Sequence, residues 1–150
     1  MVGLDFKIGN EYNNYLYKIF SSIDLSKYLW EIVTDDIICN ENKNEGLFSS
    51  RYIDGKNFMN EISKSNYYLI FANLKAFPIN AKPKRIENFN DFWESDCQMI
   101  LLCVDSEFIN FYCKDKVLLE SVYRNCKKNG FKSIEFVTFE DASHRSMIAF

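Results

Sequence analysis

Short segments in which every second residue is apolar recur along the chain, a pattern typical of β-strands with one buried face. The first is residues 2–8, where apolar side chains occupy the even positions. Asp35-Asp36 and Asp105-Ser106 are turn-forming pairs, so the segments on either side of each are predicted to form hairpins. The predicted strands are residues 2–8, 28–34, 37–39, 67–77, 97–104, 107–113 and 133–139, with a short edge strand at 147–150.

Between these strands, apolar residues spaced three and four positions apart predict helices with one buried face. The clearest stripes lie at residues 12–20 and between residues 115 and 130. Gly130 is placed to take the left-handed conformation that ends a helix. Each predicted helix has a side chain suited to cap its first turn: Asn10, Asp54, Asn90 and Asp115.

The predicted order of elements is β-α-β-β-α-β-α-β-β-α-β(-β), which indicates an α+β fold with a mixed or mainly antiparallel sheet and about four helices. A chain of 150 residues is expected to form one domain, residues 1–150. Both prolines and the one basic cluster lie in residues 78–88, a candidate boundary between halves. Each half runs helix, hairpin, helix, strand, so residues 10–77 and 89–139 are hypothesised to be repeats. Residues 40–46 are polar and are predicted to form a loop.

The second hairpin carries apolar residues on both faces, which places it in the middle of the sheet. A three-residue loop at residues 104–106 would pair Cys97 with Cys113 and Leu101 with Ile109.

The strand at residues 67–77 is the main pointer to a binding site. Tyr68, Ile70 and the alternate residues after them form an apolar face, whereas Asn73 and Lys75 interrupt the opposite face. Polar groups on an otherwise apolar strand face are typical of the polar end of an aromatic interface patch or of a pocket for a small molecule. The candidate binding residues are these two and two neighbours expected to lie close to them: Asn73, Lys75, Asp96 and Tyr112.

The sequence contains no motif of an established catalytic class. The phosphate-binding glycine loops, the nucleophile elbow and the paired-cysteine motifs are absent. The single histidine, His144, lies in a polar segment near the C-terminus and is expected to be exposed. Carboxylates at residues 91–96 and 105–107 are best explained as caps, turns and solvated faces. We therefore expect no catalytic residue, metal or cofactor. The alternative function is a small-molecule-binding domain or a weak hydrolase with a pocket near Asn73 and Lys75.

The N-terminus lacks the features of a signal peptide, and no apolar run approaches the length of a membrane span. The five cysteines are an odd number and lie mostly in apolar runs. They are therefore expected to be reduced thiols in a cytoplasmic protein with no membrane association.

Charge and aromatic content bear on partners. The net charge is −3, with 18 basic and 21 acidic residues, which disfavours nucleic acid as a partner. Aromatic residues make up 17% of the chain, more than the core is expected to need. The first hypothesis is therefore a non-catalytic protein-interaction module, immunity-like or regulatory, with a basic partner and a capacity to form homodimers. The aromatic residues suspected of forming its interface are Tyr67, Tyr68, Phe77, Trp93 and Tyr112.

Several strings resemble those of a family of small proteins from spore-forming Gram-positive bacteria, catalogued as a domain of unknown function. They are Asn10-Glu11-Tyr12, residues 68–78, Ser95-Asp96-Cys97, Tyr112-Cys113-Lys114-Asp115 and Asn129-Gly130-Phe131. The resemblance covers nearly the whole chain and implies a single domain, and it implies no activity, substrate or catalytic residue.

Overall fold

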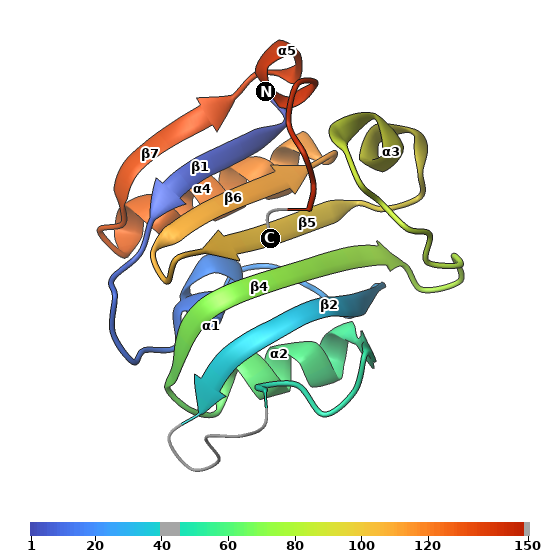
Figure 1. Cartoon of the computed structure of the whole chain (residues 1–150). Helices are drawn as coiled ribbons and strands as arrows, with labels where there is room; N and C mark the ends of the chain where they lie inside the picture. The colour runs from blue at the N-terminus through green and yellow to red at the C-terminus, as the bar shows by residue number, and fades with distance from the viewer. Residues whose placement is uncertain (40–45, 149–150) are drawn as a thin grey trace.

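The structure, a computed structural model, describes residues 1–39 and 46–148. Within them the chain forms an antiparallel sheet of seven strands in the order β3-β2-β4-β5-β6-β1-β7, with five helices packed against it (Figure 1). The strands are β1 (Gly3–Lys7), β2 (Tyr28–Cys39), β3 (Tyr52–Asp54), β4 (Tyr67–Pro78), β5 (Met99–Val104), β6 (Phe108–Cys113) and β7 (Lys132–Val137). The helices are α1 (Tyr15–Phe20), α2 (Gly55–Ser63), α3 (Phe89–Glu94), α4 (Lys116–Lys128) and α5 (Phe139–Ala142). The α+β class and the antiparallel sheet agree with the prediction.

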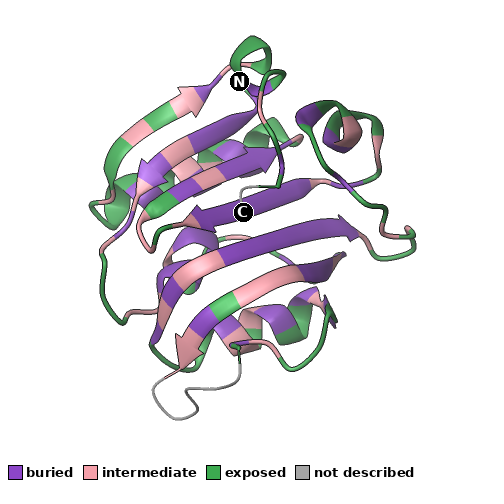
Figure 2. Cartoon of the chain, viewed as in Figure 1, coloured by how far each residue is buried: buried purple, intermediate pink, exposed green. Residues whose placement is uncertain are grey.

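Both faces of the sheet are covered, and each carries its own core. Helices α1, α2 and α4 lie on one face, and α3, α5 and the C-terminal tail lie on the other (Figure 1). On the first face Trp30 stacks on Phe58 with ring centroids 4.1 Å apart. On the second face Phe89 and Phe92 pack with strand residues, and the central strands are buried along most of their length (Figure 2).

The two covered faces explain where the aromatic residues go. Of those suspected of forming an interface, Tyr67, Phe77 and Tyr112 are buried, Tyr68 is half-buried and Trp93 is exposed. The Tyr67 hydroxyl group donates to the Ile62 carbonyl oxygen at 2.9 Å and accepts from the Leu16 N–H at 3.0 Å. The prediction that these side chains exceed the needs of the core was wrong for the three buried ones, because a sheet covered on both faces has two cores to fill.

Capping side chains were predicted correctly for the two longest helices. The Asp54 side chain accepts from the Asn57 N–H, the Asp115 side chain accepts from the N–H groups of Val117 and Leu118, and Gly130 has a φ of +69°. The other two predicted caps were wrong. Helix α1 begins at Tyr15, after Asn14, and the cap of α3 is Asn88, not Asn90.

The predicted hairpin at Asp35-Asp36 does not form, because β2 continues through these residues. The Asp35 carboxylate instead accepts from the N–H groups of Leu47 at 2.9 Å and Phe48 at 2.8 Å. The strand that pairs with the outer side of β2 is β3, residues 52–54. Most of the predicted loop at residues 40–46 lies outside the described residues.

Two bulges change which side chains share a face of the sheet. The pairing of β2 with β4 skips Val33 on β2 and Ile70 on β4. Because an extra residue reverses the alternation, Tyr67 and Leu69 join Ala72, Leu74 and Ala76 in the core under the helices, where the unbroken pattern had placed Tyr68 and Ile70. From Ala72 onward the predicted faces are correct.

The β5–β6 hairpin forms with a different register. Met99, not Cys97, lies opposite Cys113, and Leu101 lies opposite Phe111. The reason is the turn, in which Asp105 and Ser106 both have positive φ and the loop extends through Glu107. The shift is two residues, so the faces are unchanged.

The halves do not share one topology. Strand β4 returns to pair with β2, whereas β7 pairs with β1 and with neither β5 nor β6. Helix α3 also lies on the opposite face of the sheet from α4 (Figure 1). The repeat hypothesis was therefore wrong. Residues 147 and 148, the described part of the predicted edge strand, form no strand. Ser146, which precedes them, makes an isolated bridge with Asn88, and residues 149 and 150 lie outside the described residues.

Candidate functional site

Polar side chains meet on β2 and β4, on the face of the sheet opposite α1 and α2. In the strand register Glu31 lies across from Lys75, and Thr34 lies across from Asn73. The bulge at Val33 produces the second pair, because it shifts the alternation by one residue. Glu31, Asn73 and Lys75 are 6%, 3% and 3% exposed. Burying three such groups beside one another is costly unless each is hydrogen-bonded or paired with an opposite charge.

These side chains line a pocket of about 360 Å³, a size suited to a small molecule. Its walls come from β2, β3, β4, the segment before α3 and the C-terminal tail. The polar lining residues are Glu31, Thr34, Arg51, Tyr52, Asn73, Lys75, Lys84 and Arg85, and the apolar ones are Val33, Pro83, Ile86 and Ile148.

Lys75 is the buried amine of this pocket. Its Nζ donates to the Ile86 carbonyl oxygen at 3.1 Å, and no carboxylate in the described part of the chain forms an ion pair with it. Burial lowers the pKa of Lys75, and the nearby Glu31 carboxylate only partly offsets this effect. The neutral amine, whose lone pair is free to react, is therefore more populated than in an exposed lysine.

Glu31 is already engaged by the pocket wall. Its Oε2 accepts from Arg51 Nη2 at 3.0 Å and from the Tyr52 hydroxyl group at 3.3 Å. Arg51 is mostly exposed, with 58% of its side chain accessible. The guanidinium group therefore keeps N–H donors free for a ligand.

Asn73 has an unused acceptor. Its Nδ2 donates to the Met147 carbonyl oxygen at 3.4 Å, but its buried Oδ1 has no partner within the described residues. Buried polar atoms are almost always hydrogen-bonded, so this acceptor, in a residue that lines the pocket, is left for a donor from water or from a ligand. The lining carries one carboxylate, Glu31, against four basic side chains: Arg51, Lys75, Lys84 and Arg85.

Of the four candidate residues, the structure brings Asn73 and Lys75 together and separates the other two. Asp96 is exposed in the connection between α3 and β5. Tyr112 is buried on β6, where its hydroxyl group accepts from Arg145 Nη1 at 3.1 Å. Burial raises the pKa of Tyr112. Its contribution to the pocket is indirect, because Arg145 anchors the tail that carries Met147 and Ile148.

Sequence reasoning missed Glu31, Arg51 and Tyr52. Glu31 lies in a buried strand at a position where an apolar side chain would be expected. An acidic residue there could have been recognised from the sequence as a candidate, as Lys75 was on β4. Arg51 and Tyr52 had no such signal, since their place depends on which strand pairs with β2.

The remaining candidates for chemistry lie apart from this pocket. His144 is exposed, and no cluster of histidine, cysteine and acidic side chains suited to a metal occurs among the described residues. Burial raises the pKa of each thiol in Cys97, Cys103, Cys113 and Cys126 to about 12. These four groups are therefore protonated at neutral pH and are poor nucleophiles.

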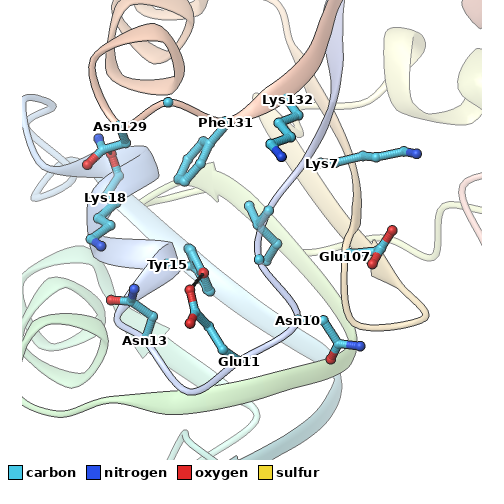
Figure 3. Close-up of a pocket in the computed structure, with 13 residues that line it drawn as sticks. Lys7, Asn10, Glu11, Asn13, Tyr15, Lys18, Glu107, Asn129, Phe131 and Lys132 are labelled. Atoms are coloured by element: carbon cyan, nitrogen blue, oxygen red, sulfur yellow. Dashed lines mark hydrogen bonds between the residues drawn. The ribbon is translucent and has the colours of Figure 1, made fainter.

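A second pocket, of about 550 Å³, lies where the ends of β1 and α4 meet α1 (Figure 3). Tyr15 and Phe131 contribute its aromatic lining, and the Tyr15 hydroxyl group donates to Glu11 Oε1 at 2.7 Å. Three lysines, Lys7, Lys18 and Lys132, line it. Its charged residues are half-buried or exposed, so it lacks the costly burial seen around Lys75. Sequence reasoning missed this pocket, although two of the strings that resemble the family, at residues 10–12 and 129–131, contribute to it.

None of the helices in residues 1–39 and 46–148 combines the length and the apolar character that crossing a membrane requires.

Comparison with known proteins gives a family and a relative. The family model described as "Protein of unknown function (DUF2691)" matches residues 1–148. The "Uncharacterized protein YncE" of Bacillus subtilis (strain 168) is 30% identical over 148 residues, which are 97% of this chain and 97% of that protein. No solved structure matches the chain.

Proposed function

The chain belongs to the family described as "Protein of unknown function (DUF2691)", and we propose that it binds a small organic anion in the Lys75 pocket. The observation that carries the proposal is the buried, unpartnered Oδ1 of Asn73, which lines a pocket together with the buried amine of Lys75. Folding alone does not need these groups there, because apolar side chains on this face would cost less to bury. Their presence is accounted for by a ligand that hydrogen-bonds to both.

The charges of the lining support an anion. Arg51 has free N–H donors, and the exposed Lys84 adds a positive charge. A ligand with a carboxylate or phosphate group would interact with these cations, and a hydroxyl or amine group on it could donate to Asn73 Oδ1. We place binding ahead of the alternative, hydrolysis, because Cys97, a neighbour of Lys75, has a pKa raised by burial to about 12 and is not activated as a nucleophile.

The test is a thermal-shift screen with small carboxylates and phosphate monoesters, each paired with its neutral amide or alcohol. A bound anion at 100 times its Kd should stabilise the folded protein by about 2.7 kcal/mol and raise Tm. The Arg51→Gln variant should lose most of that rise. Lys132→Gln, which removes a charge from the second pocket, should keep it. Equal shifts in both variants, or no anion that outperforms its neutral partner, would contradict the proposal.

A second candidate is the protein-interaction module, favoured by one exposed surface. Trp93 and Phe139 are 39% and 47% exposed, and their rings meet edge to face with centroids 5.0 Å apart. The acidic residues Glu94, Glu140 and Asp141 are exposed beside them in sequence. Aromatic anchors among carboxylates suit a partner that presents basic side chains.

This second candidate is tested with the purified chain as bait in a lysate, beside the double variant Trp93→Ala, Phe139→Ala. A stoichiometric basic protein retained by the wild type and lost from the variant would support it. Retention by both baits, or recovery of no stoichiometric protein, would count against it.

For either function we propose a cytoplasmic setting. All five cysteines are free thiols, although two or more would be expected to pair in an oxidising compartment. This argument rests on the cysteines alone, so it applies equally to the anion pocket and to the exposed aromatic surface.

A further inference from the structure

The environment of Lys75 suggests more than electrostatic attraction of an anion. An ammonium group has three N–H donors, and the described residues supply its Nζ with one acceptor, the Ile86 carbonyl oxygen. The carboxylate across the strands, Glu31, is held by Arg51 and Tyr52. A buried amine without an ion-pair partner is better satisfied as a neutral amine, which has two N–H bonds and a lone pair.

The surroundings of this amine define what it can react with. A guanidinium group, Arg51, and a phenol, Tyr52, line the same pocket as Lys75, and Asn73 lies two residues away on the same face of β4. The positive charges of the lining thus favour a ligand with a carboxylate. The nucleophilic amine of Lys75 favours a ligand that also has an electrophilic carbon beside that carboxylate. A 2-oxo acid has these two groups on adjacent carbon atoms.

We propose that Lys75 condenses with the keto group of a small 2-oxo acid whose carboxylate is held by Arg51, forming a reversible imine. The inference rests on the proposed function, because it requires an anion in the Lys75 pocket. The Nζ lone pair attacks the carbonyl carbon and gives a carbinolamine. The carbonyl oxygen then leaves as one water molecule with the two protons of the amine, and the nitrogen–carbon double bond forms. No electron is gained or lost, so the step needs no oxidant or reductant.

The pocket supplies what such a step requires. Burial increases the fraction of the amine that is deprotonated and limits the access of the bulk water that would hydrolyse the imine. The Tyr52 hydroxyl group, hydrogen-bonded to Glu31, is a proton donor and acceptor in the same pocket for the departing water. Lys84, an exposed lysine that lines the same pocket, lacks the burial that activates Lys75.

The experiment is reductive trapping with pyruvate and sodium cyanoborohydride near neutral pH, followed by intact-mass measurement and peptide mapping. We expect a single adduct, equal to one pyruvate minus water plus two hydrogens, on Lys75. It should form at least about tenfold faster than on any other lysine, as expected for an activated amine. The Lys132→Gln variant, which removes a lysine from the second pocket, should trap pyruvate like the wild type, and Lys75→Met should not. An adduct spread over exposed lysines, or no adduct, would overturn the imine.

A binding measurement separates this inference from the proposed function on which it rests. Pyruvate is also titrated without the reductant while Tm is followed. A saturable rise in Tm with no adduct on Lys75 would leave the anion pocket in place and reject the imine. Failure of every anion in the screen, together with absent trapping, would reject both. Mapping the adduct in the wild-type protein keeps the test decisive even if Lys75→Met is poorly folded.

Discussion

Replacing Arg145 with methionine should lower the free energy of unfolding by about 2 kcal/mol, the scale of a charge-assisted hydrogen-bond pair that is only partly buried. Arg145 donates through Nη1 and Nη2 to both oxygens of the Asp5 carboxylate, at 2.9 and 2.8 Å. It also donates to the Tyr112 hydroxyl group at 3.1 Å. These bonds fasten the C-terminal tail to β1 and β6, so their loss weakens the core beneath α3 and α5.

The same replacement should weaken the Lys75 pocket. The tail places the Met147 carbonyl oxygen next to Asn73, from which it accepts a hydrogen bond. It also places Ile148 in the lining of the pocket. Release of the tail removes that wall, so we expect the anion-dependent rise in Tm to shrink along with the basal Tm. Urea unfolding measures the first effect, and the thermal-shift titration measures the second.

The matched control is Arg124→Met. Arg124 pairs with Glu120 along the exposed face of α4, at 3.9 Å and with both side chains more than 60% exposed. An ion pair of this kind contributes about 0–0.5 kcal/mol, so the control should unfold like the wild type. Equal stability of the Arg145→Met and Arg124→Met proteins would show that the tail is not held as described.

Replacing Lys75 with methionine should raise the free energy of unfolding by about 1–2 kcal/mol at neutral pH, the usual gain when a residue retained for function is removed. Methionine keeps most of the buried chain length and removes an amine that is costly to bury as a cation. The gain is limited because the Ile86 carbonyl oxygen loses its donor. A variant that is more stable yet binds no anion is the result expected of a functional residue.

The pH dependence of this difference follows from the lowered pKa of Lys75. Between the pKa in the folded protein and the ordinary value of 10.5, the unfolded chain holds the extra proton. The wild type therefore gains stability relative to the variant as the pH rises through this window. Below the window the wild type bears the full cost of the buried charge. The advantage of Lys75→Met should thus be largest below the pKa of Lys75 in the folded protein and should narrow as the pH rises toward 10.5.

Urea unfolding of both proteins at neutral pH and at an alkaline pH measures the difference, and Lys84→Met is the control. Lys84 is exposed in the same pocket, so its replacement should change stability little and without a trend in pH. If Lys75→Met is destabilising at every pH, the amine contributes to folding and the argument for a functional lysine fails.

Local chemistry along the chain was enough to predict most of the elements. The caps Asp54 and Asp115 and the glycine at position 130 act on their own helix ends, within a few residues. The alternation from Ala72 to Phe77 correctly separated an apolar face from the face of Asn73 and Lys75, because successive side chains of a strand point to opposite sides. Those two residues were found for the same reason: each is polar where the period demands an apolar side chain.

Only the tertiary structure decided what lies next to that face. Glu31 is 44 positions from Lys75 in the printed sequence, and they face each other because of the register of β2 with β4. That register includes a bulge at Val33, which places Thr34 opposite Asn73. Bulges and register depend on how distant segments pack together, and no window of neighbouring residues carries that information. Asp96 and Tyr112 were misjudged for this reason.

The covering of the sheet is decided in the same way. Phe77 and Tyr112 were predicted to exceed what the core needs, because the sequence does not show that α3, α5 and the tail cover the second face of the sheet. Once both faces are covered, these rings are needed to fill a second core, and burial of apolar area favours that arrangement. Residue types and periods thus determined most of the helices and strands and singled out two polar residues of the candidate site, Asn73 and Lys75. Long-range packing determined the register, the second core and the pocket that surrounds Lys75.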